Sequence, residues 1–475
     1  MPFLKNRKGR ILVLAGLLAS LTACTPPVEA PPSGSGKPAE LRILYATAEA
    51  NAAAVQAILP AFKEKYGIEL KFDTQPYEAL QQKVFSEFAS SSSYYDIVIV
   101  DTPWAPALVG QLEPLDKYVG DPALNDIAPV ALNDFIPKVF YDTTVYKADQ
   151  SSVHYTETDA APDISAITAK GFNVYGLPIQ ANAQVMAYRQ DLFNDSKEQA
   201  AFKASNGRDL AVPKTWDEFR DVAKFFTRPA EKLYGTTVMA GVGDWATDDF
   251  KSMLAAWGGD GHLVSDDFRM SLASPEGVQA LQFYTDLINK DKVVPPGSTS
   301  ASWDEAASLF DAGTTALTMN YHSLELTDAV KGGQIGYAVV PTQKAVGPHF
   351  GTWMLSLNKY SNNKQWAYRA MTWLTSAEQQ IAMTDNGLHP TRVSVYDAIK
   401  NSAKSGDEKA FYDVLGQSLA VGVGRARLTN YTEVSNAVAK AVNSAANGST
   451  TPQAALEGAA AEVKRLLTEA GYRVP

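Results

Sequence analysis

The chain has 475 residues, of which 45% are hydrophobic and 10% aromatic, and its formal net charge is −10 at pH 7. This length can bury more than one core, and about 150 residues per domain predicts two or three folded units. The acidic balance argues against binding to nucleic-acid phosphates, and the single cysteine, Cys24, excludes an intrachain disulfide or a thiolate metal cluster.

Two patterns bear on cofactors and metals. Gly422 and Gly424 begin a dinucleotide-binding fingerprint that Arg427 breaks. The five histidines lack the i, i+4 spacing that places two metal ligands on one helix face. We therefore expect no cofactor and no metal site.

The first 40 residues have the layout of a secretory signal followed by a tether. A basic head precedes an apolar run from Ile11 to Ala23, which has too few residues to cross a bilayer core, where a helix needs about 20. Leu21-Thr22-Ala23-Cys24 resembles the bacterial lipobox, in which the cysteine thiol is acylated and becomes the new N-terminus. The alternative is a chance cysteine in a spent signal peptide. We expect a signal peptide over residues 1–23, a flexible linker over 24–40, and an exported protein that is lipid-anchored at Cys24 on the extracytoplasmic face of a bacterial cell membrane.

Ordered structure is predicted from residue 41 onward. Residues 41–45 read as a short strand, 55–66 carry apolar side chains at helical spacing, and 68–72 alternate as in a strand. A second helical pattern over residues 80–88 leads to the fully apolar strand 97–100. This alternation of strands and helices predicts a parallel sheet with helices on its faces.

A second set of such units begins after about residue 185. Thr215 is a predicted N-cap, and Glu218, three residues later, completes a capping box. Further short strands are predicted over residues 236–240, 315–319 and 335–340, and helices over 434–445 and 452–469. Two α/β lobes fit this pattern better than one large sheet.

Aromatic and polar side chains follow several of the predicted strands. Ligands of open parallel sheets bind beyond the carboxyl ends of the strands, and the residues there are Asp101, Trp104, Asp244, Trp245, Asn320, Tyr321, His322 and Trp353. Aromatic faces beside carboxylates and amides suit a sugar or a polyol. Arg392 is almost the only arginine or lysine in such a position, so an anionic ligand is not expected. Taken singly, each residue has a structural alternative, because tryptophans often pack in cores and Asp or Asn often caps a helix.

Several ordered motifs resemble one family. Gly176-Leu177-Pro178, Val185 to Arg189 and Asp191-Leu192-Phe193 resemble the signature of family 1 extracellular solute-binding proteins, the maltose-binding-protein-like receptors of ABC importers. The same family is suggested by residues 213–219, by 303–319 and by Leu388-His389-Pro390-Thr391-Arg392. The resemblance covers roughly residues 41–470.

The resemblance implies an α/β, two-lobed periplasmic-binding-protein-like fold of type II topology, in which each lobe is a mostly parallel sheet with flanking helices. The ligand would lie in the cleft between lobe 1 (41–180 plus 355–388) and lobe 2 (181–354 plus 389–475). Chain crossings are expected near residues 177–186, 349–355 and 387–392. The segment 142–172 is longer than is usual for the family, and it is interpreted as either an extra hairpin or an Asp-rich loop at the cleft rim. The predicted ligand-binding residues are Thr47, Tyr77, Asp101, Trp104, Asn182, Gln184, Asp244, Trp245, Asn320, Tyr321, His322, Trp353 and Arg392.

The predicted function is that of a lipid-anchored receptor, not an enzyme. It captures a neutral carbohydrate or polyol by hinged closure of the lobes and delivers it to a two-subunit or homodimeric ABC permease with a cytoplasmic ATPase. A monomer is expected, without a nucleic-acid partner. Two alternatives stay open: an extracytoplasmic glycoside hydrolase, which needs two carboxyl groups flanking one bond, and a surface lipoprotein without a transport role.

Overall fold

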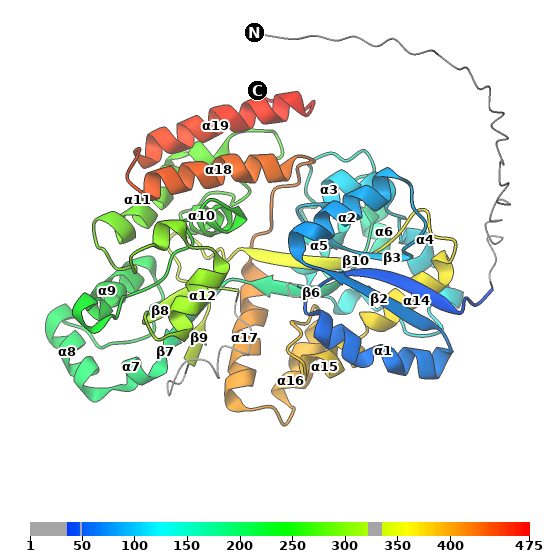
Figure 1. Ribbon diagram of the computed structural model, residues 1–475, viewed down its shortest axis with the longest axis horizontal. Helices are drawn as coiled ribbons and strands as arrows, with labels where there is room; N and C mark the ends of the chain where they lie inside the picture. Colours follow the sequence, from blue (N-terminus) through cyan, green and yellow to red (C-terminus); the bar gives the residue numbers. More distant parts are fainter. Residues whose placement is uncertain (1–35, 48–49, 322–334) are drawn as a thin grey trace, which may run out of the picture.

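A computed structural model describes residues 36–47, 50–321 and 335–475 of the chain (Figure 1). The predictions for the signal peptide, for Cys24, for the linker up to residue 35 and for His322 therefore lie outside the described residues. In the described part of the chain, no helix combines the length and apolarity needed to cross a membrane.

The first lobe is built around a five-stranded sheet in the order β2-β1-β3-β10-β6. β1 pairs in parallel with β2 and β3, whereas β10 runs antiparallel to β3 and β6. Three of these strands confirm the predictions over residues 41–45, 68–72 and 97–100. The strands are β1 (Glu40–Ala46), β2 (Glu69–Gln75), β3 (Ile97–Asp101), β6 (Leu177–Ala183) and β10 (Phe350–Leu357).

The second lobe contains a three-stranded sheet in the order β8-β7-β9. Its strands are β7 (Val185–Arg189), β8 (Leu317–Asn320) and β9 (Ile335–Ala338), and both of its ladders are antiparallel. The expectation of a mostly parallel sheet therefore holds for the first lobe and is wrong for this one.

The strand predicted over residues 236–240 is absent. The backbone N–H groups there bond to scattered partners instead of one ladder: Thr236 to Val293 O at 3.1 Å and Met239 to an Asp249 carboxylate oxygen at 3.1 Å. Apolar, β-branched sequence favours an extended backbone, but only a neighbouring strand makes that backbone part of a sheet.

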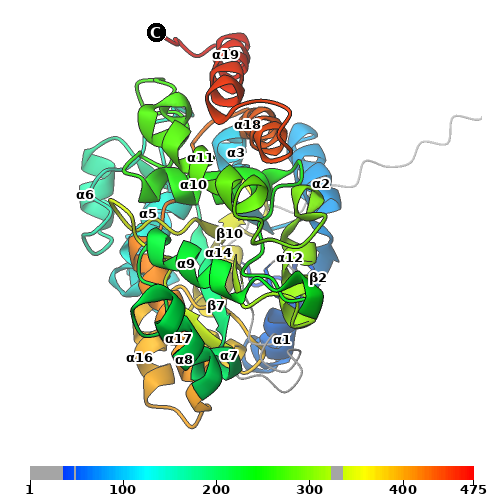
Figure 2. The same ribbon diagram turned by 90° about the vertical axis from the view of Figure 1, so that its left-hand side faces the viewer.

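Helices cover the sheets and fall into three groups (Figures 1 and 2). Those of the first lobe are α1 (Ala52–Tyr66), α2 (Tyr77–Ala89), α3 (Ala105–Leu108), α4 (Asp116–Val119), α5 (Pro137–Thr144), α6 (Ile164–Ala169), α14 (Lys364–Leu374) and α15 (Ala377–Thr384). Those of the second lobe are α7 (Gln190–Asn194), α8 (Ser196–Asn206), α9 (Trp216–Phe226), α10 (Asp244–Ala256), α11 (Pro275–Asn289), α12 (Trp303–Asp311), α18 (Tyr431–Ala446) and α19 (Pro452–Glu469). α16 (Val393–Lys400) and α17 (Gly406–Val421) lie below the junction of the lobes (Figure 1).

Three hydrophobic cores hold these elements together. One joins residues of 41–179 with residues of 353–388, and a second joins residues of 186–317 with residues of 426–467. The third packs α16 and α17 against side chains from β6, β7 and β9, so it spans both sheets. The lobe boundaries given above stay a prediction.

The chain passes between the sheets at two of the expected crossings. Gln184 separates β6 from β7, and the segment before Phe350 leads from β9 into β10. The two crossings touch, because the Gln184 N–H donates to the His349 carbonyl at 2.9 Å.

The long segment over residues 142–172 is closed by a short two-stranded ladder. β4 (Val145–Tyr146) pairs antiparallel with β5 (Asn173–Val174), and α6 lies between them. Tyr155 is buried and stacks on Tyr141, with ring centroids 4.6 Å apart. Residues 147–172 connect the two strands, so the ladder closes a long loop that contains a helix and is not a hairpin.

The predicted capping box of α9 is present. Thr215 Oγ1 accepts from the Glu218 N–H at 3.2 Å, and the Glu218 carboxylate accepts from the Thr215 N–H at 3.2 Å. We expect Thr215→Ala to lower the free energy of unfolding by about 1 kcal/mol, because the helix N-terminus loses a hydrogen-bond acceptor. Urea denaturation measures this change, and Thr215→Ser is the control that keeps the acceptor. Equal stability of the Ala variant and the native protein would contradict the assignment.

Candidate functional site

Three aromatic side chains of the first lobe gather at the end of β3. Tyr77 is the first residue of α2, and Trp104 follows β3. Trp353 lies on the neighbouring strand β10, where it pairs with Asp101 of β3. The ring centroids of Tyr77 and Trp104 are 5.0 Å apart, and those of Trp104 and Trp353 are 5.5 Å apart. Both indoles are buried, whereas Tyr77 is half-buried, so Tyr77 is the member of this group with the most accessible ring.

Asp101 is the carboxylate of this group. Its Oδ2 accepts from the Tyr77 hydroxyl at 2.9 Å, and its Oδ1 accepts from the Thr102 N–H at 2.8 Å. Burial raises the pKa of Asp101 to about 6, although Arg425 and the Tyr77 hydrogen bond favour the charged form.

The second lobe contributes another aromatic group. Trp245 lies in the first turn of α10, Trp303 opens α12, and Tyr321 follows β8. The ring centroids of Trp245 and Trp303 are 5.3 Å apart, and those of Trp303 and Tyr321 are 6.2 Å apart. The Nε1 atoms of both indoles are buried without a hydrogen-bond partner among the described residues. Each is therefore a donor that a bound acceptor would satisfy.

Asn320 forms hydrogen bonds with two residues of this group. Its amide donates to the Trp303 carbonyl at 2.9 Å, and its Oδ1 accepts from the Tyr321 N–H at 2.8 Å. The structure thus gives this predicted ligand residue a role in holding the two aromatic residues in place.

Arg425 joins the two lobes electrostatically. It lies between α17 and α18, where its Nε donates to Asp244 Oδ2 at 3.1 Å and its Nη2 donates to Asp248 Oδ2 at 2.9 Å. Asp244 Oδ1 also accepts from the Tyr431 hydroxyl at 3.2 Å. Arg425 also lies against β10 of the first lobe, because a Cβ on Gly351 would be 3.3 Å from its Nη1 atom, and Asp101 is within its electrostatic reach. We call these side chains, together with Asp101 and the two aromatic groups, the inter-lobe site.

Sequence reasoning missed Arg425, Asp248, Trp303 and Tyr431 as site residues. Arg425 directly follows Gly422-Val423-Gly424, a run that had been considered only as a broken fingerprint. Gly351 leaves room for it, because a Cβ there would lie 3.3 Å from the Arg425 Nη1 atom. No strand ends at Arg425, so its position in the sequence carries no strand-end signal.

Gln184 and Asn182 form hydrogen bonds elsewhere. Gln184 donates to Asp249 Oδ1 at 2.8 Å and contacts the Ser252 hydroxyl, which in turn accepts from the His349 N–H at 2.7 Å. Both crossings are thereby bound to α10. Asn182 Oδ1 lies 2.6 Å from His389 Nδ1, at the third expected crossing.

Arg392 is not at the site, which corrects the prediction. Its Nη2 donates to the Val130 carbonyl at 2.9 Å and its Nη1 to the Ala131 carbonyl at 3.0 Å, while its guanidinium lies over the Phe135 ring. Arg392 is only 1% exposed. A buried guanidinium needs hydrogen-bond acceptors, and these backbone carbonyls supply them. Thr47 lies exposed just beyond β1, where its backbone N–H donates to Gln75 O at 2.9 Å and its carbonyl accepts from the Ala52 N–H at 3.1 Å.

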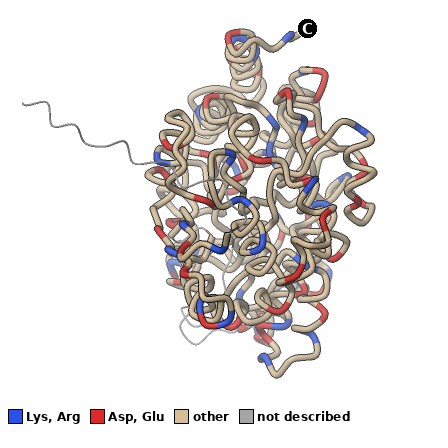
Figure 3. The backbone as a smooth tube through the Cα atoms, turned by 90° about the vertical axis from the view of Figure 1, so that its right-hand side faces the viewer, with Lys and Arg blue, Asp and Glu red and all other residues tan. Residues whose placement is uncertain are grey.

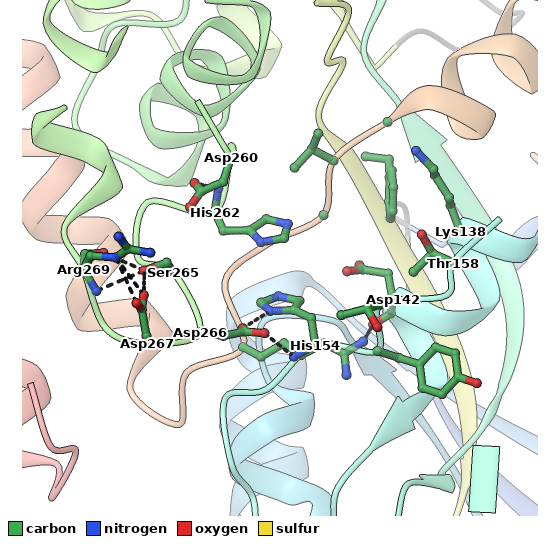
Figure 4. Close-up of a pocket in the computed structure, with 17 residues that line it drawn as sticks. Lys138, Asp142, His154, Thr158, Asp260, His262, Ser265, Asp266, Asp267 and Arg269 are labelled. Carbon is green, nitrogen blue, oxygen red and sulfur yellow. Dashed lines mark hydrogen bonds and ion pairs between the residues drawn. The ribbon is translucent and has the colours of Figure 1, made fainter. Parts of the chain in front are cut away.

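A separate cavity of about 580 Å³ lies between the segment after α5 and the loop after α10 (Figure 4). His154 Nδ1 meets Asp266 Oδ1 there at 2.6 Å, and the His154 ring stacks on His262 with centroids 4.2 Å apart. None of the predicted ligand-binding residues lines it. The residues that line this cavity include both acidic and basic side chains and only a few aromatic rings. Its lining therefore differs from the aromatic-rich inter-lobe site.

The inter-lobe site suits an uncharged, polyhydroxylated ligand. Its one arginine already pairs with two carboxylates, so it leaves little positive charge for an anion. Among the described residues, no group of three or more His, Cys, Asp or Glu side chains could hold a metal ion.

Comparison with known proteins places these features in context. Residues 46–381 match the sequence model of the family described as bacterial extracellular solute-binding protein. A mannitol-binding protein of Pseudomonas aeruginosa is 22% identical over 448 residues, which cover 88% of this chain and 91% of that protein. An ABC transporter solute-binding protein of Agrobacterium radiobacter in complex with ribitol matches with a TM-score of 0.69 and 26% identity over 90% of this chain and 100% of the other. A maltose-bound T. maritima protein matches with the same TM-score and 24% identity, again over 90% and 100% of the two chains. These likenesses confirm the predicted two-lobed fold.

The raised pKa of Asp101 yields a stability prediction. The folded state holds the proton of this carboxyl more tightly than the unfolded chain does, so ionised Asp101 costs stability above pH 6, and this cost disappears as the pH falls below about 4. We expect Asp101→Asn to raise the free energy of unfolding at pH 7, by on the order of 3 kcal/mol for a shift of about two pKa units. Thermal unfolding at pH 7 and pH 4 measures the difference. Asp159→Asn, at a largely exposed carboxylate, is the control, and an Asp101→Asn variant that is less stable at pH 7 would contradict the assignment.

Proposed function

Because the chain belongs to the family of bacterial extracellular solute-binding proteins, we propose that it captures a neutral sugar or polyol for an ABC importer. The observation that carries this proposal is the inter-lobe site, where Tyr77, Trp104 and Trp353 form an aromatic group on one lobe and Trp245, Trp303 and Tyr321 form another on the second lobe. Arg425 binds Asp244 of the second lobe and lies against Gly351 of β10, the strand that carries Trp353.

The chemistry of the site supports a hydroxylated ligand. Aromatic faces pack against the C–H faces of such a ligand, and carboxylates accept hydrogen bonds from its hydroxyl groups. The relative that binds mannitol and the structure that holds ribitol support the same ligand class. Lys and Arg alternate with Asp and Glu along the backbone in Figure 3, without the one-sided basic stripe that nucleic acids attract.

Capture would use relative motion of the lobes. A ligand that contacts both aromatic groups binds the closed arrangement more tightly than the open one, so it shifts the population toward closure. The crossings between β6 and β7 and between β9 and β10 are the segments where the backbone would bend.

The family and its structural neighbours are binding proteins, and a role without catalysis is part of our proposal. A glycoside hydrolase would release reducing sugar from oligosaccharides, so an assay for reducing ends tests this alternative directly.

The protein would work outside the cytoplasm, as its family does. We further propose that it is held at the membrane by a lipid on Cys24 and delivers its ligand, as a monomer, to a two-subunit or homodimeric permease driven by a cytoplasmic ATPase. The lipobox-like Leu21-Thr22-Ala23-Cys24 supports the anchor.

A thermal-shift screen against neutral sugars and polyols tests the ligand class. A ligand at 100 times its dissociation constant adds about 2.7 kcal/mol to the stability of the protein, which raises its melting temperature measurably. We expect Trp245→Ala to weaken binding of a compound found in this way about 30-fold, because a stacking face worth about 2 kcal/mol is lost. Trp366→Ala, in α14 of the first lobe, is the control that should leave affinity unchanged. Unchanged calorimetric affinity in the Trp245 variant would exclude this ring from the site.

The anchor has its own test. We expect Cys24→Ser to move the protein from the membrane fraction to the soluble extracytoplasmic fraction, because the serine hydroxyl cannot take the thioether-linked lipid. Fractionation with immunoblotting measures this, and Thr25→Ser is the control. A Cys24 variant that stays in the membrane fraction would refute the anchor but not the ligand site.

A further inference from the structure

His349 is fully buried at the crossing from β9 into β10, and its ring connects two residues of the inter-lobe site. Its Nδ1 contacts the Tyr321 hydroxyl, and its Nε2 lies 3.2 Å from Asp248 Oδ1. Neither Nε2 nor Asp248 Oδ1 has a hydrogen-bond partner of its own among the described residues, so each is the available partner of the other. Asp248, His349 and Tyr321 thus form a chain that ends at the Tyr321 hydroxyl.

The His349 ring is neutral. Burial lowers its pKa well below the usual value, and the cations Lys251 and Arg425 lower it further. A neutral imidazole carries hydrogen on one nitrogen and accepts on the other. The direction of the whole chain therefore depends on which of the two nitrogens is protonated.

The protonation of Asp248 decides that direction, and burial raises its pKa to about 8, so the carboxylate form prevails above that pH. Its Oδ2 accepts from Arg425 Nη2 at 2.9 Å, and this charge-assisted bond favours the carboxylate. A carboxylate only accepts hydrogen bonds, so it requires the His349 hydrogen on Nε2. Nδ1 then accepts, and the Tyr321 hydroxyl must donate to it. Asp248 Oδ2, 3.5 Å from the same hydroxyl, is likewise an acceptor.

We propose that, with Asp248 ionised, His349 is a positioning residue: it holds the Tyr321 hydroxyl hydrogen inside the protein, so that the Tyr321 oxygen faces the ligand as a hydrogen-bond acceptor. This inference rests on the proposed function of the inter-lobe site and refines its ligand class. A ligand must offer a donor at this point, which a hydroxyl group does and a methyl ether does not.

Two other tyrosines are arranged in the same way. The Tyr77 hydroxyl donates to Asp101 Oδ2 at 2.9 Å, and the Tyr431 hydroxyl donates to Asp244 Oδ1 at 3.2 Å. Each phenol oxygen of the site therefore has its hydrogen committed to the protein. Three acceptors of fixed direction match a ligand with several hydroxyl groups.

A double-mutant cycle with ribitol as the probe, or with the polyol that gives the largest thermal shift, tests the positioning role. The variants are Tyr321→Phe, His349→Gln and the double variant. Calorimetry is run at pH 9, because burial raises the pKa of Asp248 to about 8. Besides Arg425, the charged groups Asp244, Asp101 and Lys251 act on this carboxyl. We expect about tenfold weaker binding for Tyr321→Phe and about fivefold for His349→Gln, as for the loss of one hydrogen bond. The double variant should match Tyr321→Phe within about twofold.

His349→Asn provides the matched rescue. Its side-chain oxygen can take the place of Nδ1 and accept from Tyr321, whereas the Gln amide reaches toward the position of Nε2. We expect the Asn variant to bind more tightly than the Gln variant. A His349 effect that multiplies with that of Tyr321→Phe would overturn the proposal, because His349 would then act through the fold and not through the hydroxyl.

Nitrogen-15 NMR of the histidine-labelled native protein tests the direction of the chain without a ligand or a destabilised variant. The chain has five histidines, and comparison with the His349→Gln spectrum assigns this one. Hydrogen on Nε2 at pH 9 is expected, and hydrogen on Nδ1 would overturn the proposal. If the native protein binds no polyol or sugar of the screen, the proposed function fails and this inference falls with it. If it binds but the cycle is additive, only this inference fails.

Discussion

The inter-lobe site depends on one buried cation. Asp244 and Asp248 both accept from the Arg425 guanidinium, and Asp101 lies within its electrostatic reach. Without that guanidinium, three carboxylates in a largely dry space would repel one another and take up protons. These carboxylates outnumber the guanidinium, so the site has fixed hydrogen-bond acceptors and no spare positive charge for an anion. An uncharged ligand with many hydroxyl groups suits such a site.

The residues of the inter-lobe site that the sequence singles out are those next to regular strands. Asp101 follows an apolar strand and Tyr321 lies just beyond another, and carboxyl ends of strands lie where ligands bind in such sheets. The capping box of α9 is equally local, because the four residues from Thr215 to Glu218 contain both of its hydrogen bonds. Where the physics is local or follows from strand direction, a single sequence predicts position well.

The remainder depends on contacts between distant segments. Arg425 and Arg392 are both arginines close to glycine or proline in the chain, yet one pairs with carboxylates of α10 and the other with backbone carbonyls near residue 130. No periodicity distinguishes them, because the difference lies in which acceptors the fold brings to each guanidinium. The same is true of residues 236–240, whose β-branched and apolar sequence forms no strand ladder.

Helix α10 gives the ligand face a short mechanical route to both crossings. Its first turn carries Asp244 and Trp245, and its next turns carry Asp249 and Ser252, which hold Gln184 and His349. Eight residues of helix separate the two ends of this arm, roughly 12 Å at the usual rise per residue. An α-helix is stiff over such a length. A displacement of the Trp245 indole would therefore move the crossings at Gln184 and His349 with it, and the side-chain packing around the helix would absorb little of that movement.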